Sequence, residues 1–359
     1  MIVSSGGLAW WKQYSGLSEL RITQRYHRQS RLCPRPNEPL SLIGATGGPR
    51  IQIMLTRSVL IYLSRQEGLK DFAARFRLFK RLTTRFVAGE TIEEAIAAIR
   101  ELNAEGCSAS FDHLNESVAN PAEAEEEVKE YLQILRRIDE TGINSNVSIK
   151  LTQFGLELDQ DLAYKNARAV VVEAARRGNF VRVDMEASNV TQKTIDIFKR
   201  LRAEFELNDV GIVLQSYLRR TYADAQELIK LPARIRICKG AYNEPPEVAF
   251  PDKKDTDENY VRVMQLLLSS GIYHGIATHD PKMIDATLEF SRREGIPKAA
   301  FEFQMLYGVR RDLQRQLAKD GYNMRVYVPY GKHWYPYFMR RLAERPANIW
   351  FVLKNMLKG

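Results

Sequence analysis

The stretch NVSIKLTQFGLELDQDLAYKNARAVVVEAARRGNFVRVDM, residues 146–185, contains the pattern that decides the fold. It begins with a β-rich run at 146–151, continues through a helical pattern at 162–178 that ends in glycine, and returns to a β-rich run at 180–185. Short runs of β-branched residues favour strands, and a terminal glycine is typical of a helix C-terminus. The stretch therefore predicts one strand–helix–strand unit of a parallel sheet.

The same alternation extends along the chain from residue 107. The predicted strands are residues 107–111, 146–151, 180–185, 211–215, 234–239, 274–278, 299–304 and 324–328. Helical patterns lie between them, including 191–205, 222–230, 258–270 and 285–295. Eight strands, each followed by a helix over roughly 250 residues, are typical of a (βα)8 barrel of the TIM type. A doubly wound open sheet is the alternative, and we favour the barrel because no dinucleotide-binding glycine loop follows the first strand.

The chain before the barrel divides into two parts. Residues 1–53 contain the stretches SSGG, CPRPNEP and GATGGPR and little apolar periodicity, so we interpret them as disordered or as a non-native N-terminal extension. Helical patterns follow at 56–65, 70–87 and 91–104. We therefore predict one domain over residues 54–359, with N-terminal helices followed by the barrel.

Composition and charge narrow the class of protein. The 359 residues are 45% hydrophobic and 27% charged, as in soluble globular proteins. Residues 1–53 hold seven Lys or Arg side chains and two acids, and so carry +5 of the net charge of +9. Because of this excess of basic residues, a nucleic-acid-binding protein is one alternative. The rest of the chain lacks a basic helix with interleaved aromatics, so we expect no nucleic-acid partner.

The cysteines and apolar runs indicate the compartment. Cys33, Cys107 and Cys238 are scattered, and neither they nor the five histidines show a metal-ligand spacing or a disulfide framework. No apolar run is long enough to cross a bilayer. The sequence therefore predicts a cytoplasmic protein without a metal site.

Polar and charged residues stand at or near the end of every predicted strand. In chain order they are Asp112, Glu116, Lys150, Asp184, Glu186, Gln215, Arg236, Lys239, Tyr242, Thr278, His279, Glu302, Gln304 and Tyr327. Each has a structural explanation when taken alone; Asp184, for example, could cap a loop. In (βα)8 barrels, however, catalytic residues lie at the C-terminal ends of the strands. Together these residues predict an active site at that end, which we call the mouth.

The segment YFMRRLAERP, residues 337–346, predicts a helix that Pro346 stops. Tyr337, Arg340, Arg341 and Glu344 fall on one face of this helix. Beside them, Phe338 and Leu342 form an apolar strip that can pack inward. The pair of arginines suits an exposed face with an Arg–Glu pair, or a clamp that binds a carboxylate or phosphate. Because the segment follows the last strand, it can reach the mouth, and we favour the clamp.

Eight motifs carry a resemblance to a known family. They are FDHLNESV, SIKLTQFGL, VRVDMEAS, VLQSYLRRT, RICKGAYNEP, ATHD, FEFQMLYGVR and VYVPYGKHWYPYFMRRLAERPAN, in this order between residues 111 and 348. Together they resemble proline dehydrogenase in its monofunctional bacterial form, over about residues 54–359. Two residues depart from the family pattern, His333 in GKHW and Asp280 in THDP.

The resemblance implies a fold and an activity. The family fold is a distorted (βα)8 barrel that binds FAD without a Rossmann fold, with the last helix over the mouth. The implied reaction is the FAD-dependent oxidation of L-proline to 1-pyrroline-5-carboxylate, the first step of proline degradation to glutamate. Its electrons pass to a membrane quinone, so we expect peripheral contact with the inner face of the cytoplasmic membrane.

The resemblance also implies residue roles. Lys150, Arg340 and Arg341 would hold the proline carboxylate, and Tyr327, Tyr337 and Leu306 would pack against its ring. Asp184 would support the pocket floor, Asp112 and Glu116 would pair with the cationic residues, and Arg236 would approach flavin N5. The other expected FAD contacts are Gln215, Lys239, Gly240, Ala241, Tyr242, Lys253, Thr278, His279, Gln304 and Glu344.

The residues themselves leave one further enzymatic alternative open. A lysine at a strand end is typical of Schiff-base lyases on this barrel, with Lys150 as the nucleophile.

Overall fold

The structure is a computed structural model that describes residues 83–115 and 117–344. Within this part, eight parallel strands form a closed barrel in chain order, and the last strand pairs with the first. The strands are β1 (Ser108–His113), β2 (Ser145–Ile149), β3 (Val181–Val183), β4 (Val210–Gln215), β5 (Arg234–Cys238), β6 (His274–Ala277), β7 (Phe301–Leu306) and β8 (Asn323–Tyr330). The predicted (βα)8 barrel is confirmed.

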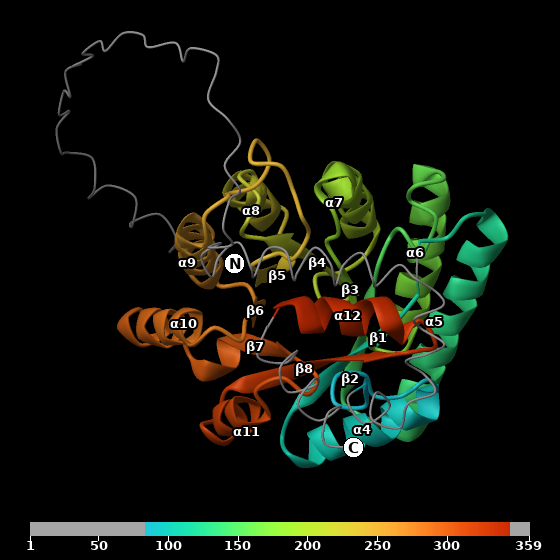
Figure 1. Ribbon diagram of the computed structural model, residues 1–359, viewed down its shortest axis with the longest axis horizontal. Helices are drawn as coiled ribbons and strands as arrows, with labels where there is room; N and C mark the ends of the chain where they lie inside the picture. Colours follow the sequence, from blue (N-terminus) through green and yellow to red (C-terminus); the bar gives the residue numbers. More distant parts are fainter. Residues whose placement is uncertain (1–82, 116, 345–359) are drawn as a thin grey trace, which may run out of the picture. The chain divides into compact units, whose positions relative to one another are not determined.

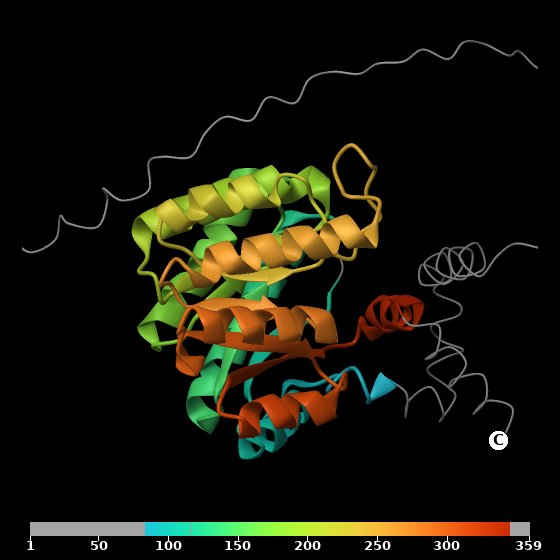
Figure 2. The same ribbon diagram turned by 90° about the vertical axis from the view of Figure 1, so that its left-hand side faces the viewer.

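Helices alternate with the strands and surround them (Figure 1). They are α4 (Ile92–Ala104), α5 (Pro121–Thr141), α6 (Gln160–Arg176), α7 (Ser188–Glu204), α8 (Thr221–Lys230), α9 (Lys253–Leu268), α10 (Pro281–Arg293), α11 (Arg311–Lys319) and α12 (Trp334–Glu344). Helix α12 crosses one end of the barrel in Figure 1. After a 90° turn it lies beyond the strand ends, on the side to which β8 leads (Figure 2). The last helix therefore covers the mouth.

Side-chain caps define the start of several helices. Thr91 accepts a bond from the Glu94 backbone N–H and forms a capping box with the Glu94 carboxylate at the start of α4. Asn120 caps α5, and Asp159 caps α6 by accepting from the Leu162 N–H at 2.7 Å. Each cap satisfies an N–H group that the first turn of a helix leaves without an intrahelical partner.

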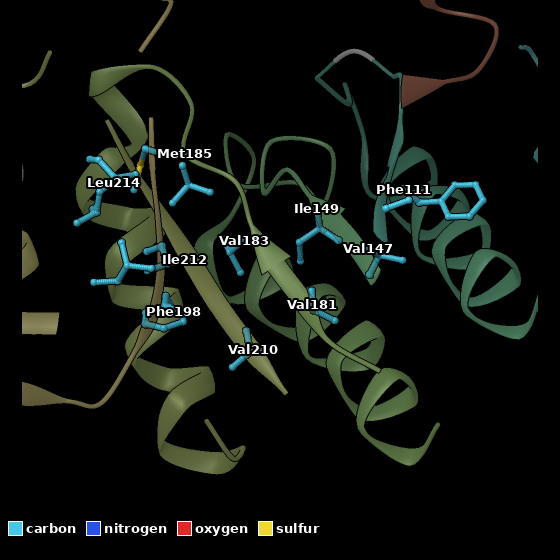
Figure 3. Packing of buried hydrophobic residues seen from close by; sticks show 14 of the residues in the cluster. Phe111, Val147, Ile149, Val181, Val183, Met185, Phe198, Val210, Ile212 and Leu214 are labelled. Carbon is cyan, nitrogen blue, oxygen red and sulfur yellow. The ribbon is translucent and has the colours of Figure 1, made fainter. Parts of the chain in front are cut away.

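The strands carry two different sets of side chains because successive residues of a strand point to opposite faces. One set is apolar and is buried with the apolar faces of the helices in one large core cluster, part of which is shown in Figure 3. Val147, Ile149 and Val183 belong to this set. The residues that alternate with them are polar and equally buried, among them Ser148 and Asp184. Buried polar groups require hydrogen-bond partners, so these side chains must pair inside the barrel.

Every predicted strand boundary lies within two residues of the observed one. The predicted start of the seventh strand at 299 is wrong by two residues, because Lys298–Ala300 forms a short 3₁₀-helix. The predicted helix 70–87 is also wrong at its end. The N–H groups of Phe86 and Val87 both bond to the Thr83 carbonyl, and the chain forms a turn there.

Several predictions fall outside the described residues. They are the interpretation of residues 1–53, the domain boundary at residue 54, the helix 56–65, most of the helix 70–87 and the role of Glu116. They stay predictions.

Candidate active site

Five side chains from five strands or strand ends form one hydrogen-bonded network at the mouth. The Lys150 ammonium bonds to the Asp112 carboxylate and lies 3.3 Å from the Tyr327 hydroxyl oxygen. The Tyr327 hydroxyl donates to Asp184 Oδ2 at 2.7 Å, and Asp184 Oδ1 accepts from the Arg236 guanidinium at 2.5 Å. Lys150, Asp184, Arg236 and Tyr327 therefore lie together, as predicted, with Asp112 as their fifth partner.

Burial and neighbouring charges shift the pKa values of four members of this network; burial raises that of Asp112. Burial opposes the charged form of Lys150, but Asp112 and Asp184 outweigh this effect and raise its pKa. Burial likewise opposes the charge on Arg236, and Asp184 raises the pKa of that group. Burial and the two carboxylates raise the pKa of Tyr327 well above its ordinary value, so its phenol remains a neutral donor. The network thus pairs two cations with two carboxylates around one neutral hydroxyl.

A second set of contacts holds the other side of Arg236. Its guanidinium lies 3.4 Å from Gln304 Oε1 and 3.5 Å from the Ser148 hydroxyl oxygen, long distances for hydrogen bonds. Its charge also lies 5.2 Å from the centre of the Tyr327 ring. Gln304, a predicted cofactor residue, therefore joins the network. Ser148 was not predicted. It stands two positions before Lys150, and residues at this spacing in a strand share a face, which indicates that both side chains point into the barrel.

The prediction that Glu302 stands at the mouth is wrong. It is the second residue of β7, so it lies near the opposite end of the barrel from Leu306, the last residue of that strand. Its carboxylate accepts from Arg325 at 2.9 Å and from the Gln304 side-chain amide at 2.5 Å. Glu302 thus lies beneath the network rather than in it.

Four charged residues form a second cluster around the end of β5. The Lys239 ammonium donates to Asp280 at 2.6 Å and also bonds to Asp257, and Lys253 contacts the same two carboxylates. Burial raises the pKa of Asp280, but its bonds to the two lysines outweigh this and lower the pKa to about 2. Asp257 was not predicted, although Lys253 and Asp257 have the i,i+4 spacing of an ion pair on a helix.

A groove opens beside this cluster. Its volume is about 630 Å³, and it lies between α9 and α10, with Lys253, Lys254, Arg262 and Lys282 among its lining residues. The excess of basic side chains makes the groove attractive to anionic groups.

The loop after β5 depends on a glycine. Gly240 has φ of 102°, a conformation that favours glycine, and a Cβ there would lie 2.1 Å from the Tyr217 ring. The two predicted cofactor residues that follow, Ala241 and Tyr242, are exposed. The glycine therefore lets the backbone pass Tyr217 and leaves these two residues accessible to a ligand.

Gln215 ends β4 and is 3% exposed. Its amide nitrogen donates to the Met185 carbonyl at 3.2 Å, while its buried Oε1 has no hydrogen-bond partner within the described part of the chain. A buried carbonyl without a partner costs free energy. The position therefore suits a ligand that donates a hydrogen bond.

Two predicted FAD contacts, Thr278 and His279, make local hydrogen bonds near β6 and β7. The Thr278 hydroxyl accepts from the Asp280 N–H at 3.1 Å, which shapes the turn before α10. The His279 ring accepts from the Leu306 N–H at 2.8 Å, which joins the β6 loop to the end of β7. These bonds give Thr278 and His279 a structural role beside the predicted one.

Helix α12 is fixed at the mouth by its apolar side. Phe338 is fully buried, and it shares a cluster with Trp334, Tyr337, Phe86 and other residues. The Trp334 ring also donates to the Glu90 carboxylate at 3.2 Å. The inward packing predicted for Phe338 is confirmed.

The two arginines of the predicted clamp differ in exposure. Arg340 is exposed, and the half-buried Arg341 places its guanidinium 5.2 Å from the centre of the buried Tyr337 ring. Lys150 and Arg340 both act electrostatically on the Tyr242 phenol. Glu344 ends the helix, and its side chain lies outside the described part. The clamp itself stays a prediction.

Comparison with known proteins identifies close relatives. Residues 95–354 match the family model described as proline dehydrogenase. The chain is 44% identical over 305 residues to proline dehydrogenase 2 of Bacillus subtilis strain 168, covering 85% of this chain and all of that protein. It is 46% identical over 281 residues to proline dehydrogenase of Deinococcus radiodurans, covering 77% of this chain and 91% of that protein.

Solved structures show the same fold. Proline utilization A from Bdellovibrio bacteriovorus superimposes with a TM-score of 0.73 at 23% identity over 82% of this chain. Proline utilization A from Bradyrhizobium japonicum gives a TM-score of 0.64 at 25% identity over 74% of this chain. The chain spans 37% and 31% of these two longer proteins, so the likeness concerns one part of each.

Proposed function

The chain belongs to the proline dehydrogenase family, and on that premise we propose that it oxidises L-proline to 1-pyrroline-5-carboxylate with bound FAD and passes the electrons to a membrane quinone. This is the first step of proline degradation. The observation that carries the proposal is the network of Lys150, Asp112, Tyr327, Asp184 and Arg236 at the mouth, beneath a helix that bears two arginines.

The substrate carboxylate would bind to the cations of the mouth. The Lys150 ammonium has three donors, and within the described residues Asp112 and Tyr327 take two of them. The remaining donor, together with the guanidinium groups of Arg340 and Arg341, would hold a carboxylate. Such fixation is chiefly positioning work, because it restricts the orientation of the small ring.

The rest of the substrate is small and apolar, apart from its amine. Tyr327, Tyr337 and Leu306 offer apolar surface for the pyrrolidine ring. The amine must be neutral for hydride to leave from the adjacent carbon, and the cations around it would lower its pKa. The residues of the mouth would thereby select the reactive form of proline.

The residues present fit FAD on observations of this structure. The partnerless Gln215 Oε1 suits a ring N–H, and Gly240 allows close approach of the backbone next to accessible Tyr242. Asp184 holds the Arg236 guanidinium beneath the mouth, where it would favour negative charge on a bound ring system. Lys239, Lys253 and the basic groove would hold the anionic end. When bound, FAD supplies the hydride acceptor that the protein side chains lack.

The remaining proposed FAD contacts lie around the same loops. Ala241, Thr278, His279 and Gln304 are on the loops or strands that border the two clusters, and Glu344 is in the last turn of α12.

A Schiff-base lyase is less well supported by the same network. Its nucleophilic lysine must be neutral to attack a carbonyl group. The carboxylates around Lys150 instead raise its pKa and favour the ammonium form. We therefore assign Lys150 to carboxylate binding.

The purified protein is expected to be yellow, because it should carry FAD non-covalently. Denaturation should release the flavin into the supernatant, and proline should bleach the oxidised flavin spectrum under anaerobic conditions. Borohydride added with proline serves as the control and should trap no adduct at Lys150. A folded, colourless protein that does not respond to added FAD would contradict the proposal.

Membrane contact is expected to be peripheral. In the described part of the chain, no helix has the length and apolar character to cross a bilayer, whereas the proposed acceptor is a membrane quinone. Washing membranes with high salt or mild detergent should therefore release the enzyme, as followed by proline-dependent dye reduction in the supernatant. Release only on full solubilisation of the bilayer would show that the attachment is of another kind.

A further inference from the structure

Glu302 is the centre of a buried hydrogen-bonded group beneath the proposed active site. The residue is 1% exposed. Arg325 Nε donates to both carboxylate oxygens of Glu302, at 2.9 Å to Oε2 and 3.1 Å to Oε1. Oε2 also accepts from the Tyr273 hydroxyl at 3.2 Å, and Oε1 accepts from Gln304 Nε2 at 2.5 Å. Burial opposes the charge on Glu302, but Arg325 and Arg182 outweigh it and lower its pKa. The carboxylate is therefore ionised and can only accept hydrogen bonds.

The Gln304 amide lies between groups of opposite hydrogen-bonding character. Below it, the Glu302 carboxylate only accepts; beside its other end, the Arg236 guanidinium only donates. One orientation of the amide satisfies both neighbours, with Nε2 toward Glu302 and Oε1 toward Arg236. The charge on Glu302 thus determines that an acceptor, rather than a donor, faces Arg236.

The neighbouring strand leaves space for this arrangement. Gly275 on β6 pairs with Arg236 on one side and with Glu302 on the other. A Cβ at residue 275 would lie 2.6 Å from Gln304 Nε2 and 3.6 Å from the Arg236 Cβ. Even a methyl group there would displace the Gln304 amide.

We propose that Glu302 is a positioning residue for the reaction, which orients the Gln304 amide and through it holds the Arg236 guanidinium in place beneath the mouth. The proposal rests on the proposed FAD-dependent function, since Arg236 is expected to act on the bound flavin. Glu302 itself lies too low in the barrel to touch the substrate, so it acts only through Gln304 and Arg236.

Glu302→Gln reverses the chain of bonds. We expect the carbonyl of the new amide at the Oε2 position, where Arg325 Nε is nearer and the Tyr273 hydroxyl donates, so its NH₂ group faces Gln304. The Gln304 amide then turns its oxygen downward and its NH₂ group toward Arg236, where two donors meet. Arg236 loses the Gln304 partner of its Nη1 group, and repulsion between the two donors shifts this side of the guanidinium, while Asp184 still binds the other side.

The variant is expected to lower kcat/KM for proline about 10- to 100-fold, as for loss of one charge-assisted hydrogen bond. The loss should fall on kcat rather than KM, because the proposed carboxylate clamp is untouched. Tyr273→Phe is the matched control, since it removes another bond to the same carboxylate without touching Gln304. It should change kcat/KM less than about twofold.

The reduction potential of the bound flavin separates positioning from a simple charge effect. Removal of a nearby negative charge alone would favour the reduced flavin and raise the potential. Displacement of the Arg236 guanidinium would disfavour the reduced flavin and lower the potential. A lower potential in Glu302→Gln supports the proposal, and a raised or unchanged potential overturns it.

Gly275→Ala provides a second test if Glu302→Gln does not fold. This variant displaces the Gln304 amide while leaving the ion pair of Glu302 and Arg325 in place, and it should also lower the potential. A potential equal to that of the wild type would contradict the proposal. The wild-type protein tests the premise separately, because failure to bind FAD or oxidise proline would refute the proposed function whatever the variants do.

Discussion

Asp184→Asn is expected to lower the free energy of unfolding by about 3–5 kcal/mol, the usual cost of breaking a buried ion pair from one side. The carboxylate is almost fully buried, and it bonds to the Arg236 guanidinium at 2.5 Å and to the Tyr327 hydroxyl at 2.7 Å. The amide has no negative charge to offset Arg236, which is itself buried. Urea unfolding at neutral pH, followed by circular dichroism, measures the difference.

Asp224→Asn is the matched control for this prediction. Asp224 is 10% exposed and also accepts two bonds from an arginine, but that partner, Arg220, is 37% exposed and stands just before α8, outside the barrel. Exposed pairs contribute about 0–1 kcal/mol, so this variant should remain close to the wild type. Equal stability of the two variants would show that the network at the mouth does not hold the barrel together.

Replacing Arg340 or Arg341 with methionine is expected to reduce kcat/KM for proline by roughly 30- to several-thousand-fold. Methionine keeps much of the apolar stem of arginine and removes the charge. Loss of one partner from a buried charge pair costs about 2–5 kcal/mol, and about 1.4 kcal/mol corresponds to a factor of ten. Binding of the substrate carboxylate would cover Arg340, which is exposed in the structure. Steady-state kinetics at matched FAD content measure the effect.

Arg136→Met controls for loss of an exposed helical arginine. Arg136 lies on α5, is 58% exposed and pairs with Glu140 at 3.6 Å. This substitution should change kcat/KM by the equivalent of no more than about 0.5 kcal/mol in activation free energy. If Arg340→Met and Arg341→Met behave like this control, the two arginines are surface residues and the clamp is refuted. The flavin should stay bound in either case, because its main proposed contacts lie on β4 to β7.

The barrel could be predicted from the sequence because its signals are local. Each strand is a short β-rich run, each helix has its own apolar periodicity, and several helices begin at a side-chain cap, as with Thr91 before α4 and Asn120 before α5. Such signals involve residues within one turn or one strand of each other, so they survive without knowledge of the rest of the chain. The inward packing of Phe338 was predictable for the same reason.

The candidate site could be predicted only in part. The residues at the strand ends indicated where the mouth lies, and the family resemblance implied roles for many of them. Composition and spacing do not reveal which polar residue pairs with which. Ser148 was missed because its partner Arg236 contacts it across the barrel. Asp257 has a local partner in Lys253, but its bond to Lys239, which follows β5, joins residues that are distant in the sequence.

By itself, the sequence determined the order and type of the elements, the eightfold count and the polar character of the mouth. Only the tertiary structure decided the pairings, because barrel closure joins residues far apart in the chain. Asp184 and Arg236 are 52 positions apart, and Asp184 and Tyr327 are 143 apart. The register between strands also decides how deep in the barrel each side chain lies. It places Glu302 below the site, whereas the strand pattern had predicted this residue at the mouth.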